Sequence, residues 1–330
     1  MLKRNENFQY QRNYPKISGY ATVYNALHLG YPVEESVLSM LGFADEVVIV
    51  DGVSNDGTYE LLQKLAEKDN RLKLYQNEWD WAEPGIDGQM KAFARALCES
   101  EFCWQQDIDE VVHEDDYQKI KMCAKKFPKD TDILHLPVID LWGTNNEVTG
   151  RKHHWKWRLS RNKPEITHGI QKDARLLNDK TGKTYSKKGM SDGCFYINVM
   201  TNEMLPHKGF WSQELDMIRN TEPEKYMDVM NNIFNQLPSV FHYSWFNLKN
   251  KINQLKKGGT WDKLWSLLYQ EESQERFPGV ETEEQIAELA KHLYEQGGED
   301  SDQIKYKFKL LRSQPAVMKN WIEKNREKYE

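Results

Sequence analysis

The chain has 330 residues, which is enough for one large domain or for a domain with a substantial extension. Its net charge of −6, from 45 basic and 51 acidic residues, lacks the basic excess of proteins that grip nucleic-acid backbones, so nucleic acid is disfavoured as the main partner. No apolar run approaches the length of a membrane span, no signal-peptide pattern is present, and the four cysteines form no CxxC pair. These features predict a cytoplasmic protein with reduced thiols.

From residue 17 to about residue 140, short apolar runs typical of buried strands alternate with segments of helical periodicity. The predicted strands are 17–23, 46–51, 71–75, 101–106 and 133–138. The predicted helices are 33–41, 57–68, 88–100 and 115–126. This alternation predicts an α/β fold, in which a mainly parallel sheet carries helices on both faces.

The pattern changes beyond about residue 140. Segments 139–160 and 192–200 have the composition of antiparallel strands, and the chain from about residue 212 to its end reads as helices. We therefore expect four segments. They are a flexible polar arm over 1–16, two parts of the α/β unit over 17–140 and 141–250, and a helical C-terminal extension over 251–330.

The triplet Asp107-Ile108-Asp109 directly follows the predicted strand 101–106. Two other Asp-x-Asp triplets, which begin at Asp130 and Asp300, do not follow a strand. Ligands of open α/β sheets bind beyond the carboxyl ends of the strands, and paired carboxylates there suit Mg²⁺ or Mn²⁺ holding the phosphates of a substrate. Taken alone, the triplet favours a solvated acidic turn over a metal site.

A second polar loop, from Asp51 to Thr58, joins the strand 46–51 to the next helix. Its two glycines permit a tight turn, and the helix N-terminus that follows favours a nearby anion. The loop is not a P-loop, because no Gly-Lys-Ser/Thr follows the glycine, and GxGxxG is absent. A capped turn without a ligand is the alternative.

These landmarks closely resemble, in order, the motifs of GT-A glycosyltransferases of the family 2 type, and most closely the lipopolysaccharide-core glucosyltransferase type. The matching segments are Tyr24-Asn25, Ala44 to Thr58, Ala94-Arg95, Asp107 to Glu110, Lys156 to Arg161, and His242 to Trp245. The resemblance covers roughly residues 17–250. It implies a GT-A, Rossmann-like fold in which 17–140 binds the nucleotide-sugar donor and 141–250 binds the acceptor.

The resemblance also assigns roles in donor binding. Asp51 would contact the nucleobase or ribose, and Tyr24 and Asn25 would line the same pocket. Arg95 would face the pyrophosphate or its neighbouring acids. Two further arginines, Arg158 and Arg161, would help to neutralise the leaving diphosphate.

A metal site is implied as well. Asp109 would bind Mn²⁺ or Mg²⁺ directly, and Asp107 would hydrogen-bond the ribose or reach the metal through water. His242 would supply a further metal or diphosphate contact, although a buried core histidine is an equal alternative for this position. A divalent cation would stabilise the negative charge that grows on a departing diphosphate.

The general base is the point at which the chain departs from the family pattern. The usual Val-His-Glu is replaced by Thr167-His168-Gly169, so the expected glutamate is missing. An acceptor hydroxyl must lose its proton as it attacks, which calls for a carboxylate. Asp192 is the preferred candidate, Asp173 the next, and Glu214 a third.

We therefore expect a metal-dependent, inverting hexosyltransferase that uses a nucleotide-diphosphate sugar, with UDP or GDP favoured, and a glycan or glycolipid acceptor. Membrane contact would be at most peripheral, through the basic helix 249–257. A nucleotidyltransferase is one alternative, but the glycine-rich basic loop of that class is absent after the first strand. A non-catalytic sugar-nucleotide-binding protein is the other, because of the missing glutamate.

Overall fold

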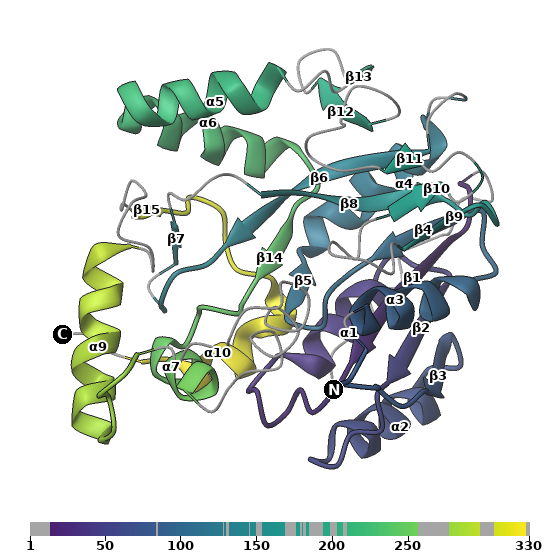
Figure 1. Ribbon diagram of the computed structural model, residues 1–330. Helices are drawn as coiled ribbons and strands as arrows, with labels where there is room; N and C mark the ends of the chain where they lie inside the picture. The colour runs from purple at the N-terminus through teal and green to yellow at the C-terminus, as the bar shows by residue number, and fades with distance from the viewer. Residues whose placement is uncertain are drawn as a thin grey trace.

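The computed structural model describes residues 14–327 apart from a set of gaps. The gaps are residues 84, 128, 130–131, 145, 150–153, 169–175, 179, 181–182, 185–193, 199–202, 207–209, 257–276 and 298–306. Within this part of the chain the fold is α/β and built on one large sheet, as Figure 1 shows. The α/β fold expected from the sequence is therefore confirmed.

The N-terminal part of the sheet is parallel. Strand β1 pairs with β2 on one side and β4 on the other, and β2 pairs with β3. These strands are β1 (Ile17–Val23), β2 (Glu46–Asp51), β3 (Leu72–Gln76) and β4 (Phe102–Gln105). The helices between them are α1 (Val33–Leu41), α2 (Thr58–Lys68) and α3 (Ile86–Ala96). Most boundaries agree with the sequence prediction to within two residues, because the buried strands are continuous apolar runs.

The sheet continues with strands from beyond residue 133, in the overall order β13-β12-β6-β8-β4-β1-β2-β3. The added strands are β6 (Ile133–Asp140), β8 (His154–Arg161), β12 (Cys194–Asn198) and β13 (Glu203–Pro206). Strand β8 runs antiparallel to both of its neighbours, β4 and β6. The segments 17–140 and 141–250 therefore share one sheet.

Two short strands complete the carboxyl edge of the sheet. Strand β14 (Val240–His242) pairs antiparallel with β5 (Glu110–Val112) and parallel with β6. In this register His242 lies opposite Glu110 on one side and Asp140 on the other. A residue far along the chain is thus brought next to the acidic triplet.

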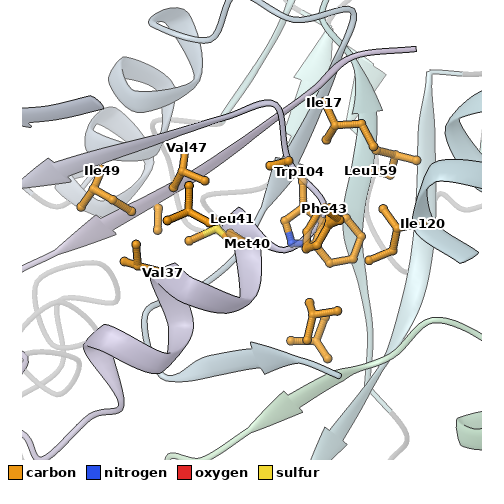
Figure 2. Close-up of a cluster of buried hydrophobic side chains, with 14 of the residues drawn as sticks. Ile17, Val37, Met40, Leu41, Phe43, Val47, Ile49, Trp104, Ile120 and Leu159 are labelled. Atoms are coloured by element: carbon orange, nitrogen blue, oxygen red, sulfur yellow. The ribbon is translucent and has the colours of Figure 1, made fainter. Parts of the chain in front are cut away.

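The helices cover both faces of the sheet. Side chains of α1, α2 and α4 (Tyr117–Lys125) join one buried cluster with Val47 and Ile49, whereas α3 packs with Val48 and Val50 on the opposite face. Figure 2 shows the first cluster, in which Met40 and Phe43 lie among side chains of β2, β4, α4 and β8. The alternation of side chains along a strand accounts for this division.

The remaining elements lie around this sheet. Helices α5 (Phe210–Thr221) and α6 (Pro223–Gln236) pack against each other, and so do α7 (Leu248–Lys256) and α9 (Glu283–Gln296). A small sheet contains β9 (Ile166–His168), β10 (Leu176–Asn178) and β11 (Lys183–Thr184). One-turn 3₁₀ helices are η1 (Glu114–Asp116) and η3 (Ala316–Met318), and α10 (Lys319–Asn325) follows η3.

The C-terminal segment contains a strand in addition to its helices, which the sequence did not predict. Strand β15 (Lys307–Lys309) pairs antiparallel with β7 (Glu147–Thr149), and its Phe308 is buried in a cluster with Phe241 of β14. Three-residue strands carry too little periodicity to be recognised in a sequence. The segment is therefore an integral part of the core around β14.

Among the helices of the described residues, none is both long enough and apolar enough to cross a membrane.

A buried ion pair attaches the C-terminal segment to the α/β unit. Arg312 Nη1 lies 2.7 Å from Asp116 Oδ2 and also donates to the carbonyl oxygen of Phe234. The exposed fractions of the Arg312 and Asp116 side chains are 6% and 0%. Lys119, whose side chain is 33% exposed, contacts the other carboxylate oxygen of Asp116 at 2.8 Å.

Replacing Arg312 by Met should lower the free energy of unfolding by about 3 kcal/mol, because removal of one partner leaves a buried carboxylate without its main counter-charge. Lys119→Met is the matched control and should cost about 1 kcal/mol or less, because its ion pair is partly solvated. Urea unfolding would measure both changes. Equal effects of the two substitutions would contradict the structural role given to Arg312.

Candidate active site

Two loops at the carboxyl edge of the sheet are joined to each other. The N–H of Asn25, after β1, donates to Ser54 Oγ at 2.8 Å, and Asn25 Oδ1 accepts from the N–H of Asn55 at 2.9 Å. Asn25 and Val53 adopt left-handed backbone, with φ of +46° and +64°. Such conformations are costly for non-glycine residues and cluster at functional sites. The predicted donor loops are therefore held in one defined arrangement.

Asp51 ends β2 and is fully buried between these loops. Its Oδ2 accepts from the N–H of Ser54 at 2.8 Å and from Gln76 Nε2 at 3.3 Å. Its Oδ1 has no hydrogen-bond partner among the described residues. A buried carboxylate oxygen without a partner is costly, so Oδ1 is suited to accept an N–H or O–H of a ligand.

Three aromatic rings lie at the same edge. Trp79 and Trp81 stack with their ring centroids 5.0 Å apart, and Tyr24 lies 5.0 Å from Trp81 and 6.2 Å from Trp79. Trp79 is 8% exposed, and its Nε1 is buried without a hydrogen-bond partner among the described residues. Sequence reasoning named Tyr24 but missed both tryptophans. Their position just beyond the strand 71–75 was the available signal.

Asp107 is held by cations. Its Oδ2 lies 3.0 Å from Lys156 Nζ, and its Oδ1 lies 3.3 Å from Lys91 Nζ and accepts from Gln105 Nε2 at 2.9 Å. Burial would raise the pKa of Asp107, but these lysines, with Arg158, outweigh burial and hold the pKa well below its usual range. Both carboxylate oxygens are thus engaged within the protein.

Asp109 has different surroundings. Its Oδ2 lies 3.1 Å from His242 Nε2, and His242 Nδ1 lies 2.6 Å from Asp140 Oδ1. Burial would lower the pKa of His242, but the carboxylates of Asp109 and Asp140 outweigh burial and raise that pKa to about 10. The structure brings Asp109 and His242 into contact, and their predicted metal-binding roles stay a prediction. Asp140 was not foreseen.

The three predicted arginines all make contacts within the protein. Arg95 is 3% exposed and donates to Ile166 O, Ser160 Oγ and Arg161 O. Arg158 is 1% exposed and donates to Glu110 and Gln105. Arg161 lies opposite Phe102, at the far end of β4 from the acidic triplet, and packs over Phe102 and Phe127.

The candidate bases are not placed. Asp173 and Asp192 lie outside the described residues, and Glu214 lies in α5 with its side chain outside the described part.

The site residues have the chemistry to bind a divalent cation whose remaining ligands come from a substrate. Asp140 can fix the imidazole of His242 by accepting from Nδ1–H, an arrangement common around metal-binding histidines. Nε2 lies against Asp109, so a cation that replaces the Nε2 proton could be held by both side chains. Over the described residues, no group of three or more acidic, histidine or cysteine side chains is arranged to hold a metal ion by itself. Mg²⁺ is commonly held by one or two protein ligands together with substrate phosphates and water.

A substitution at Gly52 tests whether the position of the Trp79 ring depends on the Asp51 loop. A Cβ at this position would lie 2.1 Å from Trp79 Cδ1, so Gly52→Ala must displace the indole. We expect a loss of about 1–3 kcal/mol in the free energy of unfolding and a changed tryptophan fluorescence spectrum. In a Trp79→Ala background the same substitution should cost much less. An equal cost in both backgrounds would show that the contact with Trp79 is not responsible.

Comparison with known proteins supports the family expectation. Residues 22–185 match the family described as Glycosyl transferase family 2. Similar solved structures include S. aureus TarS 1–349, with 18% identity, 86% of each chain covered and a TM-score of 0.37. Another is the mannosyltransferase PcManGT from Pyrobaculum calidifontis in complex with GDP-Man and Mn²⁺, with 14% identity, 66% of this chain and 65% of that chain covered, and a TM-score of 0.40.

A search of curated proteins gave no significant match. Because both TM-scores are below 0.5, the assignment rests on the family match over residues 22–185. These residues form a glycosyltransferase family 2 domain, and the chain is a glycosyltransferase that contains this domain.

Proposed function

We propose that this glycosyltransferase moves a hexose from a nucleotide-diphosphate sugar, a UDP- or GDP-sugar, to a hydroxyl of a glycan or glycolipid. The contact of Asp109 with an Asp140-oriented His242 carries this proposal. It supplies one oxygen and one nitrogen ligand at the carboxyl edge of the sheet, where a donor diphosphate can complete the coordination.

The nucleoside half of the donor fits the edge formed by β1, β2 and β3. Asp51 Oδ1 can accept a hydrogen bond from the base or ribose, and the Tyr24–Trp79–Trp81 cluster offers apolar ring surface beside it. The strained loop conformations at Asn25 and Val53 preorganise this pocket.

The chemical step is proposed to be a single displacement at the anomeric carbon, which inverts its configuration. The bond from the anomeric carbon to the diphosphate oxygen breaks while the acceptor oxygen bonds to the same carbon, and the acceptor proton passes to a general base. When bound, Mn²⁺ or Mg²⁺ held by Asp109 and His242 supplies positive charge toward the diphosphate. Asp192 and Asp173 remain the proposed bases.

The division of labour along the chain is also a proposal. Residues 17–140 would provide donor binding and 141–250 acceptor binding, with 251–330 as the C-terminal extension. Residues 1–13 of the predicted arm lie outside the described residues. A cytoplasmic location with peripheral membrane contact is proposed as well. Leu248, Ile252 and Leu255 of α7 are buried, and α7 packs against α9, so any contact through α7 would use its lysines and not its apolar face.

Asp51 is predicted to determine nucleoside affinity. Asp51→Ala should weaken the binding of UDP or GDP by about tenfold to a hundredfold, because a charge-assisted hydrogen bond is lost. Calorimetric titration of the wild type with UDP, GDP, CMP and dTDP identifies the preferred nucleotide first. Mn²⁺ affinity in the absence of nucleotide is the internal control and should not change. Unchanged nucleotide affinity in Asp51→Ala would remove Asp51 from the donor pocket.

Asp109 is predicted to be required for metal-dependent chemistry. Asp109→Ala should lower the rate of donor turnover by about 100-fold or more, as the loss of a preorganised charge-stabilising group does in other enzymes. Turnover is measured as the release of nucleoside diphosphate from UDP-glucose or GDP-mannose, and EDTA should abolish it and Mn²⁺ restore it. Asp115→Asn is the control, because the Asp115 side chain is 73% exposed. Release of pyrophosphate instead would indicate a nucleotidyltransferase.

A further inference from the structure

A chain of alternating charges runs beneath the acidic triplet. Lys91 lies between Asp87 and Asp107, and Lys156 lies between Asp107 and Glu110. Arg158 completes the chain by contacting Glu110. Three carboxylates thus face three cations in the order Asp87, Lys91, Asp107, Lys156, Glu110, Arg158.

The three cations differ in their access to solvent. The Arg158 side chain is 0% exposed and the Lys91 side chain 11%, whereas the Lys156 side chain is 30% exposed. Lys156 is therefore the cation of this chain that a ligand at the sheet edge can reach. It lies on β8, on the opposite side of β4 from the Asp51 loop.

The hydrogen bonds of Lys156 leave one donor for a ligand. Its Nζ donates to Asp107 Oδ2 at 3.0 Å and to Glu110 Oε1 at 3.1 Å. An ammonium group has three N–H donors, and no other hydrogen bond of this group occurs among the described residues. Two carboxylates already hold the Lys156 ammonium group in place. The side chain therefore loses little further conformational entropy when a ligand binds.

We propose that Lys156 contacts the diphosphate of the donor, and that Asp107 is a positioning residue for Lys156 and not a metal ligand. This inference rests on the proposed function, because it assigns a residue to the same donor site. A lysine ammonium is a compact cation suited to phosphate oxygens, and it would supply the neutralising contact that the buried Arg95 and Arg158 cannot make. It would act alongside Asp109 and His242, which would hold the metal.

The test compares nucleoside diphosphate with nucleoside. UDP and uridine, and GDP and guanosine, are titrated calorimetrically into wild type, Lys156→Met and Lys156→Arg, each with Mn²⁺ and with EDTA. We expect Lys156→Met to weaken diphosphate binding about tenfold or more in both conditions, as the loss of a charge-assisted contact does, and to leave nucleoside binding unchanged. Lys156→Arg should recover most of the loss. Lys163→Met, at a 43% exposed lysine paired with Asp132, is the control and should bind like wild type.

Nucleoside binding also reports that each variant is folded, so a destabilised variant can still be interpreted. If Lys156→Met binds UDP and GDP as wild type does, the role of Lys156 is overturned. If wild type itself binds neither diphosphate, the proposed function fails instead.

Asp107→Asn tests the positioning role. This variant should weaken diphosphate binding, and the double variant with Lys156→Met should bind no more weakly than Lys156→Met alone, because both changes act on one contact. Electron paramagnetic resonance of free Mn²⁺ should show unchanged metal affinity in the absence of nucleotide. Loss of Mn²⁺ binding in Asp107→Asn would make Asp107 a metal ligand and overturn its positioning role.

Discussion

The pairing of β14 with both β5 and β6 is the constraint on which the site depends. The strand has three residues, yet its register puts His242 opposite Glu110 and Asp140 at the same time. An imidazole held by Asp140 then faces Asp109. The contact thus needs three segments of the chain to be paired correctly, and a one-residue slip of β14 would turn His242 to the other face of the sheet.

The two aspartates of the triplet have opposite environments although they are two positions apart. Asp107 lies in a field of lysines that saturates its oxygens, whereas Asp109 faces an imidazole that can itself act as a ligand. The division follows from which strands and helices surround each residue. Lys156 comes from β8 and Lys91 from α3, while His242 comes from β14. Within one triplet, Asp107 therefore belongs to a network of neutralised charges, whereas Asp109 forms with His242 a pair that can bind a ligand.

Much of the fold and part of the site could be predicted from the sequence, because the signals are local. The strand β2 is a continuous apolar run that ends at Asp51, and the short run of β4 is followed closely by Asp107, so an acid marks the ligand-binding end of each strand. The roles of Arg95 and Arg158 could not be predicted, because an arginine in a motif carries no information on which face of the sheet receives it. Asp140, Trp79 and the strand β15 likewise depend on pairings between distant segments.

The C-terminal segment gives the molecule a particular order of assembly. Phe308 packs with Phe241 of β14, Trp321 contacts Tyr243, and Arg312 pairs with Asp116 just beyond β5. The residues that enclose β14 are thus made after the strands of the large sheet. During synthesis the Asp51 loop can form around its own strands, but the Asp109–His242 contact lacks its surrounding core until residues 308–321 have been made. The two halves of the site are therefore assembled at different times.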